Sequence, residues 1–149
     1  MKFRSVRGLD AVAVDRLDAA SRDAATTLQP LLGQRAGQGF VRRCHGDLHL
    51  AYIALEDGRP LLFDAIEFDP VIATTDVLYD LAFLLMDLVE RGLTPAANIL
   101  LNRYLVETRR VSDLDALAAL PLFLSVRAAI RSKVTAARIE RAPPAGQEQ

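Results

Sequence analysis

Hydrophobic residues along the chain recur mainly at helical spacing, with one short stretch that is typical of β-structure. From Leu9 to Leu32 the apolar residues return every three or four positions, and charged residues fall mostly on other faces. This pattern predicts an amphipathic helix that ends at Gly33. Gly37 and Gly39 predict that a loop follows it.

These three glycines have a second interpretation, a loop that cradles phosphate. Such a loop follows a strand and opens a helix. Here the predicted order is helix, loop, strand, and no G-x-x-x-x-G-K-[ST] motif occurs. The glycines are therefore expected to form a linker.

The stretch typical of β-structure lies in the first half of the chain. Phe40 to Cys44 is a candidate short strand, and two further apolar runs extend from Tyr52 to Leu55 and from Pro60 to Phe63. Glu56-Asp57-Gly58-Arg59 separates these two runs, and Asp-Gly between apolar runs is a strong hairpin signal. The pattern predicts an antiparallel β-hairpin.

A helix is predicted from about Asp76 to Arg91, capped by Thr74 or Thr75 and closed by Gly92. It is apolar on nearly every side, which is typical of a helix in the core of a protein.

Asp76, Asp80 and Asp87 form an acidic stripe on this helix. A buried carboxylate without partners is costly, so Asp80 is expected to accept hydrogen bonds from the loop around His45. Two alternatives stay open for Asp76 and Asp87, which are either similarly paired or simply solvated.

Further helices are predicted from Thr94 to about Arg109, from Ser112 or Asp113 over a short stretch, and from Pro121 to about Arg141. On the last helix, Phe123, Val126, Ile130 and Val134 are expected to face inward. Arg127, Arg131 and Arg138 share another side. We favour a solvated face for these arginines over a site for phosphate or an acidic substrate.

Composition limits the organisation of the chain. Its 149 residues, 51% of them hydrophobic, are enough for one domain with a core. We expect this domain to span residues 1–141 and the Pro- and Gly-containing residues 142–149 to form a disordered tail. Lys plus Arg number 18 against 19 Asp plus Glu, so no basic field favours nucleic acid or a membrane surface.

Cysteine content and hydropathy point to a cytoplasmic protein. Cys44 is the only cysteine, which excludes an intramolecular disulfide and a thiolate-rich zinc site. No apolar segment is long enough to be a signal sequence or to span a bilayer. We therefore expect a reducing, cytoplasmic location.

Both histidines and many of the carboxylates surround the predicted hairpin. Asp47 precedes its first strand and Asp64 follows its second, so antiparallel pairing brings both to the same end. Two separated acids suit phosphoryl transfer, in which one accepts a hydroxyl proton and the other holds a divalent metal on nucleotide phosphates. A second hypothesis makes His45, Asp47, His49 and Asp64 ligands of a hydrolytic metal centre.

Several ordered motifs resemble one family. They are His45-Gly46-Asp47-Leu48-His49-Leu50, Leu61-Leu62-Phe63, Asp64-Ala65-Ile66-Glu67-Phe68 and Asp76-Val77-Leu78-Tyr79-Asp80-Leu81-Ala82. Together they resemble the C-terminal lobe of aminoglycoside phosphotransferases, relatives of the protein kinases. The likeness runs from about Leu9 to Arg138. More narrowly, the chain resembles the phosphotransferase-like half of bacterial proteins in which a P-loop ATP-binding domain often follows.

This resemblance implies a fold and the roles of the loop residues. The fold is α+β, mainly α, with helices around a short β-hairpin that carries the catalytic loop. Asp47 is implied as the catalytic base, and His45 as the residue that braces the loop. Asp80 and His49 are implied as structural supports of the loop.

The resemblance also implies cofactors and a substrate. Asp64 matches the metal ligand of the kinase D-F-G position, and Glu67 is a second candidate ligand. Magnesium and ATP are the implied cofactors, and the implied acceptor is a hydroxyl of a small molecule.

Two departures from the family pattern change the expected activity. Tyr52 stands where the family has an asparagine that binds metal, and magnesium prefers compact oxygen ligands. Before His45 we expect one helix and a loop, so an N-terminal lobe is missing and Lys2 is the single early lysine. We expect impaired or absent phosphotransferase activity in this chain alone. The alternative is a non-catalytic binding or scaffold module that self-associates or pairs with a missing lobe or an ATP-binding domain.

Overall fold

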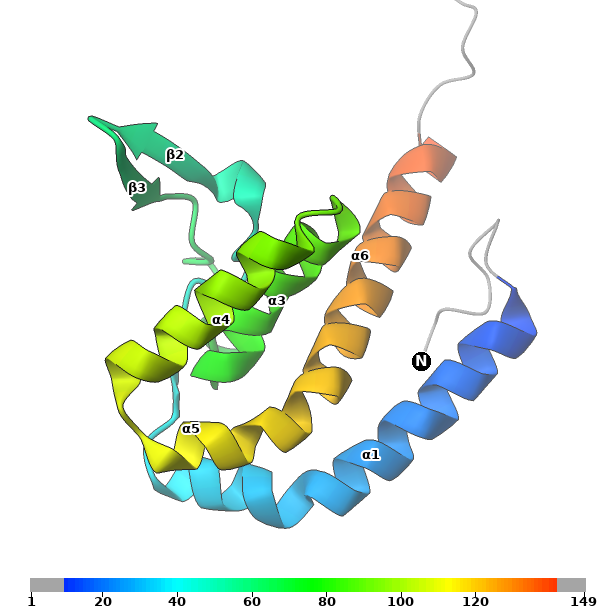
Figure 1. The fold of residues 1–149 in the computed structure, drawn as a ribbon. Coiled ribbons are helices and arrows are strands. Elements are labelled where there is room, and N and C mark those ends of the chain that lie inside the picture. The colour runs from blue at the N-terminus through cyan, green and yellow to red at the C-terminus, as the bar shows by residue number, and fades with distance from the viewer. Residues whose placement is uncertain (1–9, 142–149) are drawn as a thin grey trace, which may run out of the picture.

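The computed structural model describes residues 10–141, which form an α+β structure that is mainly α (Figure 1). The helices are α1 (Ala11–Gly37), α2 (Pro70–Ala73), α3 (Val77–Glu90), α4 (Thr94–Thr108), α5 (Val111–Asp115) and α6 (Leu120–Arg141). Two 3₁₀ turns are η1 (Leu50–Tyr52) and η2 (Ala116–Ala119), and the strands are β1 (Val41–Arg43), β2 (Ile53–Glu56), β3 (Arg59–Leu62) and β4 (Thr74–Asp76). The predicted tail, residues 142–149, lies outside the described residues.

Helix α1 is longer than its sequence pattern predicts. Asp10 caps it by accepting a hydrogen bond from the Val12 amide, and the helix continues through Gly33 to Gly37. The prediction of an end at Gly33 was wrong, because Arg35 in the last turn binds buried acids elsewhere in the fold. These contacts offset the cost of glycine within a helix, about 1 kcal/mol per residue. Gly33 is therefore in no phosphate-binding loop.

Arg35 joins three distant segments. It is 1% exposed, and its guanidinium hydrogen-bonds both carboxylate oxygens of Asp76 at 2.7 and 2.8 Å and Asp113 at 3.2 Å. Burial opposes its charge, but the two acids outweigh burial and raise its pKa. Phe40 lies beneath it, with the ring centroid 4.0 Å from the guanidinium carbon. Asp76, one of the two acids left open by the sequence, is thus buried and paired.

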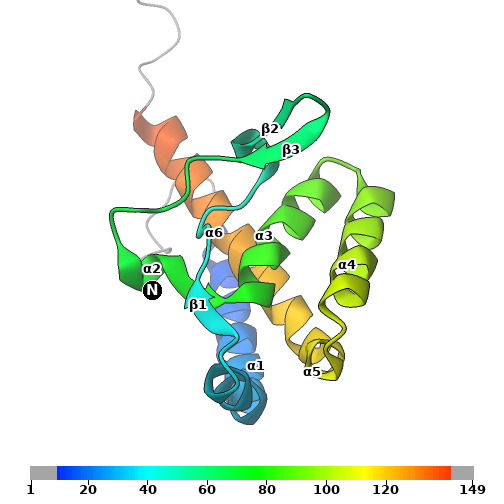
Figure 2. The ribbon, with the colours of Figure 1, turned by 90° about the vertical axis from the view of Figure 1, so that its left-hand side faces the viewer.

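The predicted hairpin is confirmed. Strands β2 and β3 pair antiparallel, and the connecting Asp57 and Gly58 have φ values of 51° and 74°, which suit a tight turn. Figure 2 shows the hairpin standing out from the helices, with the segment after β3 returning to α2 beside β1.

The structure contains a second small sheet, and the sequence predicted only one of its two strands. The expected strand near Phe40 to Cys44 is β1, and its antiparallel partner is β4. Thr74 and Thr75 belong to β4, so neither caps α3. The cap is Asp76, whose side chain accepts a hydrogen bond from the Leu78 amide at 2.8 Å. This sheet brings the chain entering the His45 loop next to the start of α3.

The core forms around α3, as its apolar sequence predicts. The nine consecutive residues from Asp80 to Leu88 are all buried, and α4 and α6 pack against this helix (Figure 1). Helices α4, α5 and α6 begin within two residues of their predicted starts, although no side chain caps α4.

Within residues 10–141 we find no helix both apolar and long enough to cross a membrane.

Candidate functional site: two acidic loops around one cavity

The second residue of the loop from His45 to Leu50 is a glycine that no other residue could easily replace. Gly46 has a φ of 83°, in the left-handed region that favours glycine. A Cβ on Gly46 would lie 2.9 Å from Cδ1 of Ile66 and 3.2 Å from its Cβ. The missing side chain lets the segment that follows the hairpin pack directly against this loop.

Asp80 anchors the start of the loop, as its burial in the sequence pattern predicts. Its carboxylate accepts hydrogen bonds from the backbone amides of His45, at 3.1 Å, and Gly46, at 2.9 Å. The side chain is almost fully buried on α3, and Arg127 of α6 lies 3.6 Å away. The prediction that Asp80 binds this loop is confirmed.

His45 connects the two loops that carry the acids. Its Nε2 lies 2.9 Å from the Phe63 carbonyl oxygen. Because that oxygen can only accept, Nε2 carries the proton and donates. The His45 backbone carbonyl in turn accepts from the Ile66 amide at 2.9 Å. The imidazole therefore braces the loop against the segment after β3, which is the geometry expected of a bracing residue.

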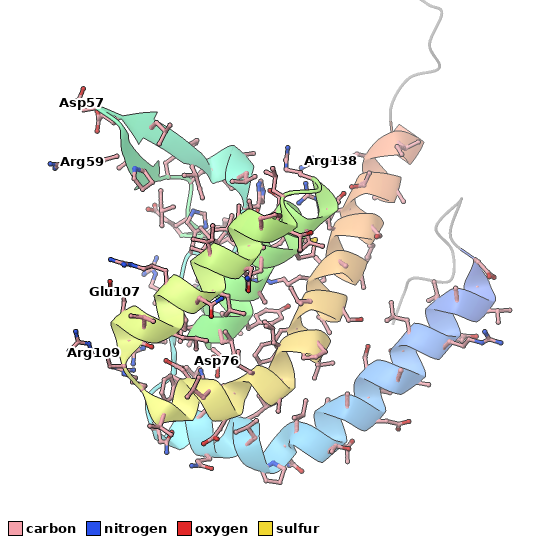
Figure 3. The ribbon with its side chains drawn as sticks, viewed as in Figure 1. Asp57, Arg59, Asp76, Glu107, Arg109 and Arg138 are labelled. Carbon is pink, nitrogen blue, oxygen red and sulfur yellow. The ribbon has the colours of Figure 1, made fainter. Side chains whose placement is uncertain are left out.

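Asp47 and Asp64 line the same cavity, which has a volume of about 480 Å³. Glu67 and Tyr52 also line it, together with Ala65, Ile66 and Phe68. The antiparallel hairpin places Asp47 and Asp64 at one end, as its register predicts, whereas Asp57 and Arg59 lie at its far tip (Figure 3). Asp64 has a φ of 61°, so the chain turns sharply where it presents this carboxylate. The structure thus brings three predicted acidic residues to one opening.

Tyr52 lines this cavity beside its acids. Burial and the negative charges of Asp64 and Asp47 raise the pKa of the Tyr52 hydroxyl. The sequence did not predict that this phenol lies close to both carboxylates.

His49 supports the loop and contacts its acid. Its Nδ1 accepts a hydrogen bond from the Ala51 amide at 3.3 Å, so the proton of the neutral ring lies on Nε2. That nitrogen is 3.6 Å from Oδ2 of Asp47. The ring packs 4.4 Å from the Tyr52 ring and edge-on to Phe83 of α3, at 5.4 Å between centroids. His49 is thus placed to orient Asp47.

The four residues of the hydrolytic-metal hypothesis do not converge. Within residues 10–141, no group of three or more His, Cys, Asp or Glu side chains is placed to hold a metal ion. His45 and His49 direct their Nε2 atoms to different partners, Phe63 and Asp47. Magnesium on a nucleotide needs only one or two protein carboxylates, because phosphate and water complete its shell. Asp64 and Glu67 provide oxygen donors of that kind.

The basic stripe on α6 is not a solvated face, contrary to our expectation. Arg127 is 6% exposed, lies over the rings of Tyr79 and Phe83 and faces Asp80. Arg131 pairs with Asp87, which is fully buried. Of the residues expected to face inward, Phe123 is buried but Val134 is 44% exposed. This side of α6 therefore faces the acids of α3 and not the solvent.

The sequence did not predict that these arginines pair with acids, and it left the state of Asp87 open. The usable signal was the presence of acids on one apolar helix and arginines at four-residue spacing on another, which together favour pairing between the helices. Arg138, farther along α6, stays exposed, and its charge acts on Tyr52.

Proteins similar to this chain occur in mycobacteria. Uncharacterized proteins of Mycobacterium bovis (strain ATCC BAA-935) and of Mycobacterium tuberculosis strains CDC 1551 and H37Rv are each 32% identical to it over 114 residues. The match covers 76% of this chain and 22% of each relative, so the chain spans about a fifth of their length. No protein-family model and no solved structure matches the chain significantly.

Proposed function

We propose that this chain carries the catalytic loop of a phosphotransferase of the aminoglycoside phosphotransferase type, with a kinase-like C-terminal lobe. One observation carries the proposal: Asp80 holds the His45–Gly46 backbone while Asp47 and Asp64 line one cavity. A base and a metal-binding acid on separate, braced segments match the parts that phosphoryl transfer requires.

In this proposal Asp47 is the general base. It is partly exposed in the cavity, where the hydroxyl of a small molecule can approach it. The carboxylate would accept the hydroxyl proton as the substrate oxygen bonds to the γ-phosphorus of ATP and the bond from that phosphorus to ADP breaks. His49, whose Nε2 lies 3.6 Å from Asp47, fixes the orientation of this carboxylate.

Asp64 and Glu67 hold the cation in this proposal. Both are exposed carboxylates that line the cavity, and oxygen donors are those that magnesium prefers. Magnesium with ATP supplies the phosphoryl group and neutralises its charge. Tyr52 replaces the family's amide ligand and lines the cavity beside Asp64, so we expect weak metal binding and impaired turnover in this chain alone.

Calorimetric titration with ATP and magnesium tests this proposal. We expect Tyr52→Asn to bind magnesium–ATP about tenfold more tightly than the unaltered chain, because it restores an oxygen ligand. Asp64→Asn is expected to abolish binding. Asp57→Asn is the matched control, since Asp57 is also exposed and has a positive φ but lies at the hairpin tip. Absence of binding in both the unaltered chain and Tyr52→Asn would overturn the enzyme proposal.

A non-catalytic binding module is the second candidate, and exposed apolar side chains favour it. Leu55 on the hairpin is 76% exposed, and Phe68 and Val71 after it are 84% and 83% exposed. Apolar surface of this kind suits contact with another polypeptide, either a second copy, a further lobe or an ATP-binding domain. Light scattering during size-exclusion chromatography tests the second copy. We expect Leu55→Ser with Phe68→Ser to abolish any self-association, and a concentration-independent monomer would exclude the second copy.

A further inference from the structure

A second carboxylate of α3 anchors the other end of the His45–Leu50 loop. Asp87 is fully buried, and its Oδ2 accepts a hydrogen bond from the Leu50 amide at 2.9 Å. Leu50 is the first residue of η1, the short turn that leads to Tyr52. The contact therefore fixes the backbone between two residues that approach the cavity acids, His49 and Tyr52.

The charge of Asp87 is retained inside the protein by arginines. Arg131 of α6 hydrogen-bonds its Oδ1, and the Arg91 Nε lies 3.2 Å from the same atom. Burial opposes ionisation, but the Leu50 amide and the two arginines outweigh it and lower the pKa of Asp87. A charged acceptor makes a stronger hydrogen bond to the amide than a neutral one.

Asp80 and Asp87 are separated by two helical turns and hold opposite ends of one loop. Asp80 binds the amides of His45 and Gly46, whereas Asp87 binds that of Leu50. Asp47 lies between these anchors. Each acid also has an arginine from α6, since Arg127 lies 3.6 Å from Asp80 and Arg131 pairs with Asp87.

We propose that Asp87, held in place by Arg131, is a positioning residue that fixes the C-terminal end of the loop and thereby the direction in which Asp47 points. This inference rests on the proposed function for its consequence in binding, but its geometric part stands independently. A merely structural role for Asp87 needs only its ion pairs with the arginines. A positioning role needs the hydrogen bond to Leu50.

Leu50→Pro separates these two roles because it removes the amide hydrogen and leaves every side chain of the ion pairs intact. Proline is favoured at the first position of a helical turn. The preceding His49 has φ −146° and ψ 168°, an extended conformation that a following proline permits. Leu50 also packs against the core, so Leu50→Ala, which keeps the amide, is the matched control.

Two readouts are compared between Leu50→Pro and Leu50→Ala. Amide hydrogen exchange followed by NMR is expected to be about tenfold faster at Asp47 and His49 in Leu50→Pro. Affinity for magnesium–ATP, measured by calorimetry, is expected to be about tenfold weaker. Equal exchange in the two variants would overturn the positioning role. Faster exchange in a protein that never binds magnesium–ATP would instead overturn the proposed function and leave the anchor standing.

A second pair of variants applies if Leu50→Pro does not fold. Arg131 pairs with both Asp87 and Glu90, but Glu90 is exposed and makes no described contact with the loop. Arg131→Met is expected to accelerate exchange of the Leu50 amide about tenfold, whereas Glu90→Gln is expected to leave it unchanged. Identical exchange in these two variants would overturn the role assigned to Arg131.

Discussion

The two segments that border the cavity are held in opposite ways. The His45–Leu50 loop is partly buried, and side chains of α3 bind its backbone at both ends. The segment from Asp64 to Asp69 is mostly exposed, and its described anchors are the hydrogen bond from the Ile66 amide to His45 and the cap that Asp69 forms on α2. The His45–Leu50 loop is therefore held by the core helix α3, whereas the segment from Asp64 to Asp69 is held partly through its contact with that loop.

This difference suits the roles that the proposed function gives each segment. A general base must meet one proton at a short distance, so a fixed backbone suits Asp47 in its proposed role. Carboxylates that share a magnesium ion with phosphate and water need room to adjust, and an exposed segment would leave Asp64 and Glu67 that freedom as the proposed ligands. Substitutions in the first segment should therefore lower stability, whereas those in the second should lower binding alone.

Removing the strongest anchor gives the largest expected effect. Asp80→Ala leaves the amides of His45 and Gly46 without an acceptor and buried Arg127 without its acid. We expect a loss of about 3–5 kcal/mol in the free energy of unfolding, measured by urea denaturation. Asp115→Ala, at an exposed aspartate of α5, is the control. A cost below about 1 kcal/mol for Asp80→Ala would show that the loop does not depend on this carboxylate.

The contact between the two segments is tested at Gly46. Gly46→Ala forces a side chain into a left-handed backbone and against Ile66, where the Cβ would lie 2.9 Å from Cδ1. We expect a cost of about 2–4 kcal/mol in the free energy of unfolding. Gly58 has a similar φ, 74°, but open space around it, so Gly58→Ala should cost only about 1–2 kcal/mol. Equal costs would mean that Ile66 moves aside freely and that the segments are not tightly packed.

Local signals in the sequence were enough to predict the hairpin and the role of Asp80. Asp57-Gly58 specifies its own turn, and an acid on an all-apolar helix requires a partner. The end of α1 was not predictable in this way, because Arg35 binds Asp76 and Asp113, which lie 41 and 78 residues away. Such pairings depend on how helices pack, which helical periodicity does not specify.

The cavity shows the same limit. The register of a hairpin places Asp47 and Asp64 at one end, so their proximity could be predicted. The position of Tyr52 beside both acids could not, because it depends on the left-handed backbone of Asp64 and on the packing of the Tyr52 ring against His49. Likewise, periodicity showed that Arg127 and Arg131 share a face but not that this face meets the acids of α3.

Acid titration examines the second anchor of the rigid loop. The folded-state pKa of Asp87 is lowered, so its contribution to stability is fully present above its unfolded pKa of about 3.9 and is lost as pH falls through the folded value. We expect the unaltered protein to lose stability more steeply below about pH 4 than Asp87→Asn, which has no proton to bind there. Thermal unfolding across this range provides the measurement. Parallel curves would show that the ion pairs of Asp87 do not favour its charged form.

The smallest expected change in stability belongs to the exposed segment. Asp64→Asn keeps a residue type that tolerates a φ of 61°, and the site is exposed, so we expect the free energy of unfolding to change by no more than about 0.5 kcal/mol. Because the neutral amide removes the charge that a cation needs, binding of magnesium–ATP should be lost in the same variant. A large loss of stability would mean that the Asp64 carboxylate itself helps to hold the hairpin to the loop. The Asp64 segment would then be a structural support of the cavity, and the contrast between a fixed proposed base and adaptable proposed metal ligands would fail.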